Sequence, residues 1–117
     1  MEWITKKRMH FRLDRRKIAV TKSHTLVITP DVVEQTGKYI IIGLDKKNRH
    51  LYIKGADRTT GYCLTQDKTG GNWRICMNNL SNKRKLAAIK PNEYALFWDG
   101  IERAFFAIVD FEEVTND

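Results

Sequence analysis

The stretch that decides the fold is residues 25–54, TLVITPDVVEQTGKYIIIGLDKKNRHLYIK. It opens with the β-branched run Thr25–Ile28, which predicts a strand. Residues 29–37 then predict a helix of one to two turns. Thr29 is placed as the N-cap, Pro30 takes the first helical position, and Gly37 closes the helix.

A β-hairpin follows, because the apolar run Tyr39–Leu44 and the run Arg49–Lys54 flank the polar turn 45–48. The second half repeats this order of elements. Residues 73–77 predict a strand, 81–89 a short helix capped by Ser81, and 94–98 with 103–109 a hairpin closed by a tight Asp99–Gly100 turn. Corresponding positions lie 52 to 55 residues apart, which predicts an internal pseudo-twofold duplication, with a coincidence of pattern as the alternative.

The remaining segments also favour strands. Between Trp3 and Leu13, apolar residues alternate with basic ones, which predicts a half-buried strand with a basic outer face. Residues 14–17 predict a turn, 18–21 a return strand, 22–24 a second turn, and 62–65 a short strand. The runs Tyr39–Leu44 and Ala104–Val109 are nearly continuous in apolar residues, as expected of central strands covered on both faces.

Together these elements predict a mostly β fold, a small barrel or a two-layer β domain with two short helices. The 117 residues form one domain, with repeat-like halves at about 18–54 and 62–109 and an acidic C-terminal tail at 110–117. Neither half alone buries enough apolar surface, whereas pairing two β-layers covers both apolar faces.

Residues 18–54 resemble the AbrB/MraZ-like swapped-hairpin superfamily of bacterial transition-state regulators, and a second copy of the pattern spans 73–109. The resemblance is carried by the strand ending at Ile28, the proline at 30, the glycine at 37 and the apolar end of the hairpin, Leu51–Ile53. Two features depart from that family: Thr29 separates Ile28 from Pro30, and the helix lacks basic residues just after the proline. The resemblance implies a β-barrel that two chains usually build and that a duplicated chain could build alone, and it implies DNA binding.

Charge is the most informative bulk property of the chain. Lys and Arg number 21 against 14 Asp and Glu, a net charge of +7, and the pI is about 9.6. Residues 1–22 hold eight basic and two acidic residues, whereas residues 91–117 hold one basic and seven acidic residues. A basic body suits a polyanionic partner, and a merely well-solvated surface is the alternative.

The sequence contains no motif typical of a catalytic or metal-binding site. Cys63 and Cys76 are 13 residues apart and make no zinc-knuckle spacing, the three histidines are scattered, and neither serine lies in a nucleophile context. We therefore expect a non-enzymatic protein with no cofactor and no metal, in which both cysteines lie in apolar strands. No apolar run is long enough for a membrane span or a secretory signal, so the expected location is the cytoplasm, and secreted, fibrous and disordered classes are excluded.

The sequence thus favours a small nucleic-acid-binding protein of bacterial or phage type, acting on DNA or RNA. The alternative is a phage-type inhibitor or accessory protein, anti-CRISPR-like or otherwise anti-defence, that binds a nucleic-acid-handling protein. The candidate nucleic-acid-binding residues are Lys6, Lys7, Arg8, Arg12, Arg15, Arg16, Lys17, Arg58, Lys68 and Arg74. Tyr62 and Trp73 flank a basic loop and are the candidates for base stacking, whereas core packing is expected of the other tyrosines and tryptophans, Trp98 among them.

Overall fold

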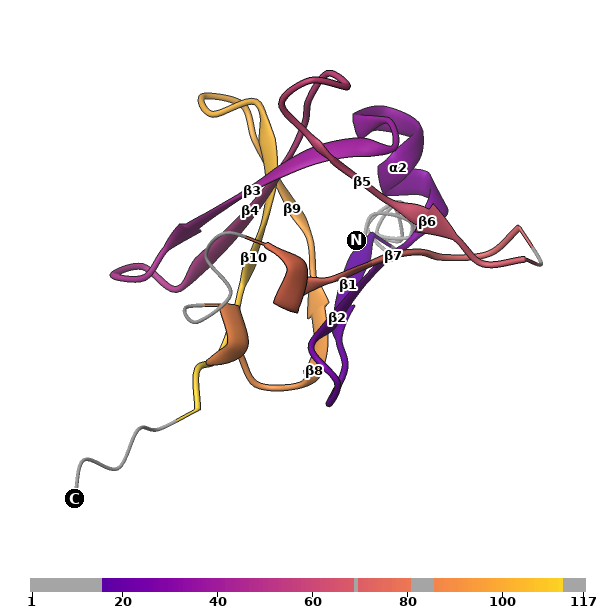
Figure 1. Ribbon diagram of the computed structural model, residues 1–117. Coiled ribbons are helices and arrows are strands. Elements are labelled where there is room, and N and C mark those ends of the chain that lie inside the picture. Colours follow the sequence, from indigo (N-terminus) through magenta and orange to yellow (C-terminus); the bar gives the residue numbers. More distant parts are fainter. Residues whose placement is uncertain (1–15, 69, 81–85, 113–117) are drawn as a thin grey trace, which may run out of the picture.

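The computed structural model describes residues 16–68, 70–80 and 86–112, which form two antiparallel five-stranded sheets packed face to face (Figure 1). Sheet A has the order β6-β7-β2-β1-β8, and sheet B has the order β5-β3-β4-β10-β9. The strands of sheet A are β1 (Lys17–Val20), β2 (Thr25–Ile28), β6 (Thr65–Gln66), β7 (Trp73–Cys76) and β8 (Asn92–Ala95). Those of sheet B are β3 (Tyr39–Asp45), β4 (His50–Gly55), β5 (Tyr62–Cys63), β9 (Phe97–Asp99) and β10 (Ala104–Ile108).

At both edges the chain passes from one sheet into the other. β5 continues into β6 through Leu64, and β8 continues into β9 through Leu96. Both leucines are buried, so each corner is anchored in the core. Strands that switch sheets at a bend are typical of two packed β-layers. The prediction of a mostly β, two-layer domain is confirmed, and the two ladders do not form a closed barrel.

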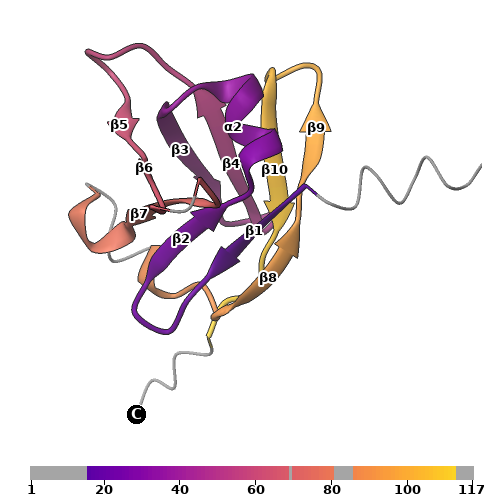
Figure 2. The same ribbon diagram turned by 90° about the vertical axis from the view of Figure 1, so that its right-hand side faces the viewer.

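The helix α2 (Pro30–Thr36) forms as its sequence predicts and closes one end of the space between the sheets (Figure 2). Thr29 is the N-cap residue, although its hydroxyl donates to the Lys17 carbonyl and accepts no hydrogen bond from a helix amide. Gly37 adopts a φ of 79°, and its amide donates to the Val33 carbonyl at 2.7 Å, which ends the helix. The helix packs through its buried valines, Val32 and Val33.

The core lies between the inner faces of the two sheets. Ile18, Leu26 and Ile28 of sheet A face Ile40, Leu51, Ile53 and Phe105 of sheet B, and all of these are almost fully buried. A short 3₁₀ helix, η2 (Met77–Asn79), and Leu86 and Ile89 complete the cluster. Among the described residues, no polar or charged residue is fully buried, as expected of a core held by apolar packing.

Several details depart from the sequence-based expectations. The second hairpin closes through the four residues 100–103 rather than through a tight Asp99–Gly100 turn, because the Asp99 carboxylate accepts the amides of Ile101 and Glu102 at 2.9 and 3.1 Å. Lys17 begins β1 instead of lying in a turn.

Other expectations fall wholly or partly outside the described residues. The strand predicted over Trp3–Leu13 lies outside them, as do the first residues of the predicted second helix, 81–85, and the end of the acidic tail, 113–117. The described start of that tail is tied to residues 88–90: Ile89 and Phe111 form a β-bridge, and the Glu112 amide donates to the Ala88 carbonyl. No helix in the described part of the chain has the length and apolar character needed to cross a bilayer.

The loop between β4 and β5, residues 56–61, is organised by one carboxylate. Asp57 Oδ1 accepts hydrogen bonds from the hydroxyl and the amide of Thr59, at 2.7 and 3.0 Å, and from the same two groups of Thr60, both at 2.9 Å. These bonds, led by the Thr59 hydroxyl, lower the pKa of Asp57 from 3.8 to about 2. The folded loop therefore favours the ionised carboxylate.

We expect this loop to add an acid-sensitive contribution to stability. Because the pKa of Asp57 is lower in the folded chain than in the unfolded chain, its contribution is complete above pH 3.8 and is lost as the pH falls to about 2. Urea unfolding at several values across this range should show stability falling more steeply for the parent than for Asp57→Asn. Parallel pH profiles for the two proteins would contradict this role of Asp57.

Candidate functional site

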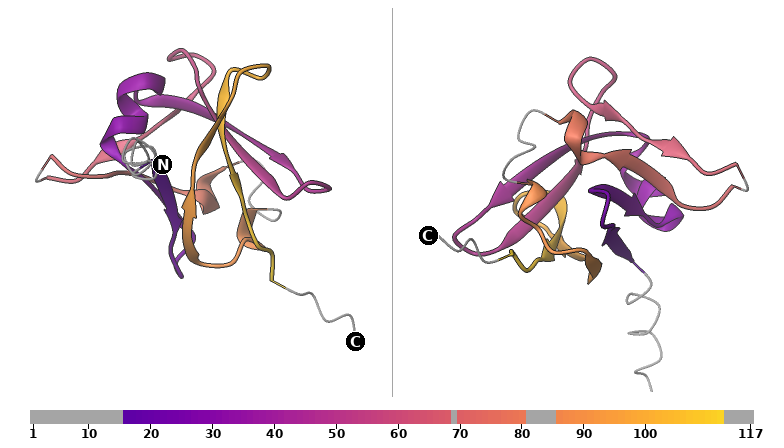
Figure 3. Two further views of the ribbon diagram at one scale, coloured as in Figure 1. Left: turned by 180° about the vertical axis from the view of Figure 1, so that it is seen from behind. Right: turned by 60° about the horizontal axis from the view of Figure 1, so that its bottom comes forward.

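The cationic residues predicted to bind nucleic acid do not converge in the described part of the chain. Lys6, Lys7, Arg8, Arg12 and Arg15 lie outside the described residues. Arg58 lies in the β4–β5 loop, whereas Lys68 and Arg74 belong to the β6–β7 hairpin. The loop and the hairpin project from the molecule in different directions (Figure 3). Among the described candidates, the structure thus brings Lys68 and Arg74 together on one hairpin. It places Arg58 on a separate loop, and Arg16 and Lys17 at the start of β1.

Three of these cations already have partners. The Arg74 guanidinium pairs with the Asp67 carboxylate through two contacts, at 2.8 and 3.1 Å. The Lys17 ammonium lies 3.4 Å from Glu93, in an exposed pair, and the Arg16 guanidinium lies 5.6 Å from the centre of the Phe105 ring. The two ion pairs offset part of the positive charge that Lys17 and Arg74 offer to a phosphate.

The two residues predicted to stack on bases, Tyr62 and Trp73, are half-buried and pack against the core. Cys63 is exposed, contrary to its expected apolar setting, and Cys76 is partly buried. Among the described residues, no group of three or more His, Cys, Asp or Glu side chains could hold a metal ion.

The feature that the sequence did not reveal is the open outer face of sheet B. Five large hydrophobic side chains are exposed among the described residues, with exposed fractions from 40% to 93%. Ile41, Phe97 and Ile108 lie on the outer face of sheet B, and Ile101 lies in the β9–β10 turn. The fifth, Trp98, pairs with Phe105 at the edge of the sheet and lies on the same side as that buried ring. The expectation that β3 and β10 are covered on both faces is therefore wrong, because Ile41 and Ile108 are 40% and 56% exposed on their outer side. The expectation of core packing for Trp98 is wrong as well, since 53% of its surface is exposed.

Neighbouring strands bring four rings together on this face, here called the aromatic row: His50, Tyr52, Phe97 and Phe106. The register pairs Phe106 with Tyr52 on one side and with Phe97 on the other, so the three side chains point the same way. The Phe106 ring lies 4.7 Å from His50, 5.7 Å from Tyr52 and 5.6 Å from Phe97 between centres. The tilted contacts of this row make a continuous aromatic platform.

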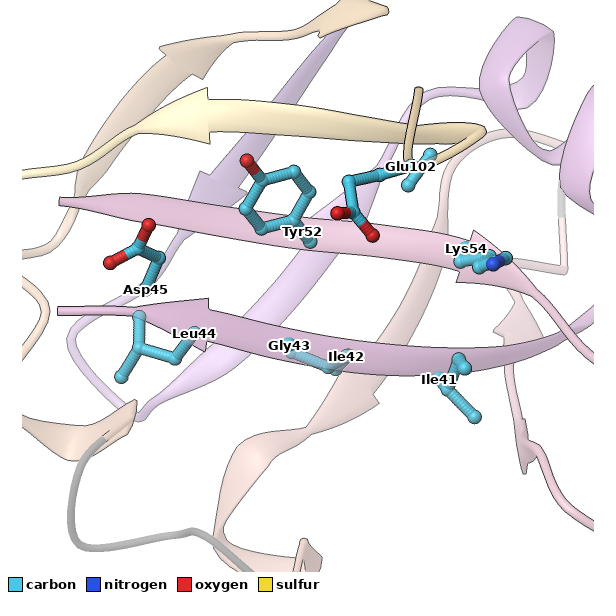
Figure 4. A pocket seen from close by; sticks show the side chains of 9 residues that line it. Ile41, Ile42, Gly43, Leu44, Asp45, Tyr52, Lys54 and Glu102 are labelled. Atoms are coloured by element: carbon cyan, nitrogen blue, oxygen red, sulfur yellow. The ribbon is translucent and has the colours of Figure 1, made fainter. Parts of the chain in front are cut away.

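Beside the aromatic row lies a groove of about 440 Å³, here called the Gly43 groove. Gly43 stands opposite Tyr52 in the β3–β4 pairing and has no side chain, so the sheet surface is hollow at this point. Ile41 and Lys54 form one end of the groove, and Asp45 lies at the other, beside Tyr52 (Figure 4). Glu102, from the β9–β10 turn, points its carboxylate toward the Tyr52 ring (Figure 4).

The groove is locally acidic although the chain is basic. Desolvation raises the pKa of Tyr52, and the nearby carboxylates of Asp99, Asp45 and Glu102 act in the same direction. Asp45 is held in place by the Asn48 side-chain amide, which donates to its Oδ2 at 2.8 Å and lowers the pKa of that carboxyl. Lys54 carries the one formal positive charge among the described residues that line the groove.

This arrangement of the described residues is suited to binding a partner. An exposed platform of aromatic and aliphatic side chains with a charged rim is typical of recognition surfaces. The available sequence signal was the alternation within each strand: Ile41, Gly43 and Asp45 share one side of β3, and His50, Tyr52 and Lys54 share one side of β4. The continuous apolar runs hid this alternation.

The chain matches no protein-family model, and neither the search of curated proteins nor that of solved structures found a significant match.

Proposed function

We propose that this chain is a non-enzymatic protein-binding module that acts through the outer face of sheet B. The supporting observation is that three of the five exposed large hydrophobic side chains of the described residues, Ile41, Phe97 and Ile108, lie on this face. A partner covering this face would bury the aromatic row, and aromatic side chains contribute much of the binding energy at protein interfaces. An inhibitory or accessory role toward a larger protein fits a small domain with such a surface.

The outer face of sheet A differs from that of sheet B in the side chains that it exposes. On the outer face of sheet A, the register aligns Thr65, Arg74, Val27, Ala19 and Glu93 in one row across the strands. These side chains are small or polar, and the two charged ones are exposed. This row has the character of ordinary solvated surface. Sheet A therefore provides a control face for experiments on sheet B.

Photocrosslinking from the two faces tests the proposal. A photoreactive phenylalanine analogue replaces Ile108 on sheet B or Thr65 on sheet A, and each variant is irradiated in its native cells. We expect one discrete adduct with another protein from position 108, none from position 65, and loss of the adduct when Gly43→Val fills the groove. The proposal fails if both positions react alike, if neither reacts, or if the adduct has the mass of two copies of this chain.

A second candidate function is nucleic-acid binding, which the net charge of +7 and the basic residues of segment 1–22 favour. Replacing Arg15, Arg16 and Lys17 together by Ala should then weaken binding to duplex or single-stranded probes. The slope of log affinity against log salt should fall by about 0.7 to 0.9 for each phosphate that the variant no longer neutralises. An Ala triple variant at Lys46, Lys47 and Lys90 removes the same charge elsewhere and should change the slope less. If the slope is unchanged in the Arg15, Arg16 and Lys17 variant, these three residues do not contact phosphates and only increase the solubility of the chain.

We also infer that the two halves are related by an internal pseudo-twofold, in keeping with the swapped-hairpin resemblance. Hairpins β1–β2 and β6–β7 meet at the β2–β7 pairing, and hairpins β3–β4 and β9–β10 meet at β4–β10. The turns agree as well: Asp45 and Asp99 each accept a turn amide, and Arg49 and Arg103 each adopt a positive φ, of 60° and 56°. An experimental structure in which these units fail to superpose would overturn the relation.

A further inference from the structure

The Gly43 groove has a composition that indicates which part of a partner it accepts. Its floor is the Gly43 backbone and one wall is the Tyr52 side chain, so an unbranched chain can lie flat against the sheet. Asp45 and Glu102 lie on either side of the Tyr52 ring (Figure 4). A group bound over Gly43 would therefore meet an aromatic ring and two carboxylates together.

We propose, on the basis of the proposed protein-binding function, that the groove receives an arginine or lysine side chain of the partner, with its cationic end between Asp45 and Glu102. The methylene stem of such a side chain packs on apolar surface while its head stays at the charged rim. A cation near a tyrosine ring gains from the ring's negative face, and carboxylates add charge-assisted hydrogen bonds.

Charge complementarity favours this occupant over the alternatives. A phosphate backbone would meet the carboxylates of Asp45, Glu102 and Asp99, which lie near Tyr52, with only Lys54 among the described lining residues to offset them. An acidic peptide would meet the same repulsion. An uncharged apolar side chain could fill the groove, but it would leave the carboxylates without a partner and remove some of their hydration.

The flanking surface adds a second requirement. Ile41 borders the groove at one end, and Phe106 and Ile108 continue the apolar face on β10. The partner segment should therefore carry apolar residues next to its cation, so that both parts of the surface are covered. A purely polybasic segment satisfies the carboxylates but leaves the aromatic row exposed.

The test uses two synthetic peptides, Ac-Leu-Arg-Leu-NH₂ and its citrulline analogue, which has nearly the same shape and no charge. Each is titrated into the ¹⁵N-labelled full chain, and the backbone amides of Gly43 and Tyr52 are followed by NMR. We expect saturable shifts at both amides and an affinity for the arginine peptide about tenfold above that for citrulline. Equal affinities, or shifts that avoid Gly43, would overturn the inference.

Paired carboxamide variants locate the interaction. Glu102 lies in an exposed turn, so Glu102→Gln should leave the fold intact and reduce the arginine preference to about threefold or less. Glu34→Gln removes an exposed carboxylate on α2, outside the groove, and should leave the preference unchanged. If Glu102→Gln retains the full preference, or if Glu34→Gln loses it as well, the cation does not bind where proposed. Photocrosslinking from position 108 tests the protein-binding function independently of the peptide titration. A failure of the arginine site can therefore be distinguished from a failure of the protein-binding proposal.

Discussion

Replacing Phe105 by Ala is expected to lower the free energy of unfolding by about 3–5 kcal/mol, as is usual for the truncation of a fully buried aromatic side chain. Phe105 is 1% exposed and is one of the largest fully buried side chains among the described residues. Its backbone pairs with Ile53 and Trp98 in the sheet. Its ring makes an edge contact with the Trp98 ring, and the two ring centres are 5.0 Å apart. Urea unfolding of the two proteins measures the difference.

The next residue along the strand is the matched control. Phe106 points to the outer face of sheet B and is only half-buried, so Phe106→Ala removes the same ring and leaves no internal cavity. We expect Phe106→Ala to cost less than half as much stability and yet to abolish the crosslink formed from position 108, whereas Phe105→Ala mainly affects folding. If the two variants cost the same stability, the outer face of sheet B is not open in solution.

The first half of the fold was predictable because its signals are local. Pro30 and Gly37 bound a helix through their own backbone chemistry, and a polar turn between two apolar runs specifies a hairpin. These elements occur within one residue of their expected bounds. The second hairpin was predictable only in part. The run 94–98, predicted as one strand, is divided at Leu96 between β8 in sheet A and β9 in sheet B. The prediction of its turn is also wrong, because Asp-Gly favours a two-residue turn and the Asp99 side chain instead caps a longer one.

The candidate site could not be predicted, since it depends on which side of a strand remains uncovered. Tyr39–Leu44 and Ala104–Val109 are apolar on both sides, and in a sequence this is typical of strands buried between two layers. Only the packing of sheet A against one face of sheet B shows that Ile41 and Ile108 stay in solvent. The apolar run around Gly43 predicts no more than a strand there, although a glycine within a strand often marks a place where another molecule approaches the backbone.

Two glycines in sheet B therefore have opposite roles, and exchanging each for alanine should separate them. At Gly55, at the end of β4, an added methyl group would stand 2.5 Å from the Thr36 carbonyl oxygen at the end of α2. At Gly43 the same methyl group would lie 3.6 Å from the Tyr52 Cβ, which is an ordinary contact. The first glycine lets a helix pack against the sheet, and the second shapes the groove.

Gly55→Ala is accordingly expected to lower the free energy of unfolding by about 1–3 kcal/mol, because the helix and strand must move apart to admit the methyl group. Gly43→Ala should leave stability unchanged or raise it by about 0.5–1 kcal/mol, since alanine loses less backbone entropy than glycine when a strand forms. Urea unfolding of the two variants beside the parent measures both effects. A Gly55→Ala protein as stable as the parent would mean that the end of α2 can shift away from β4 at no cost. The two sheets and their corners would then hold the fold without that contact.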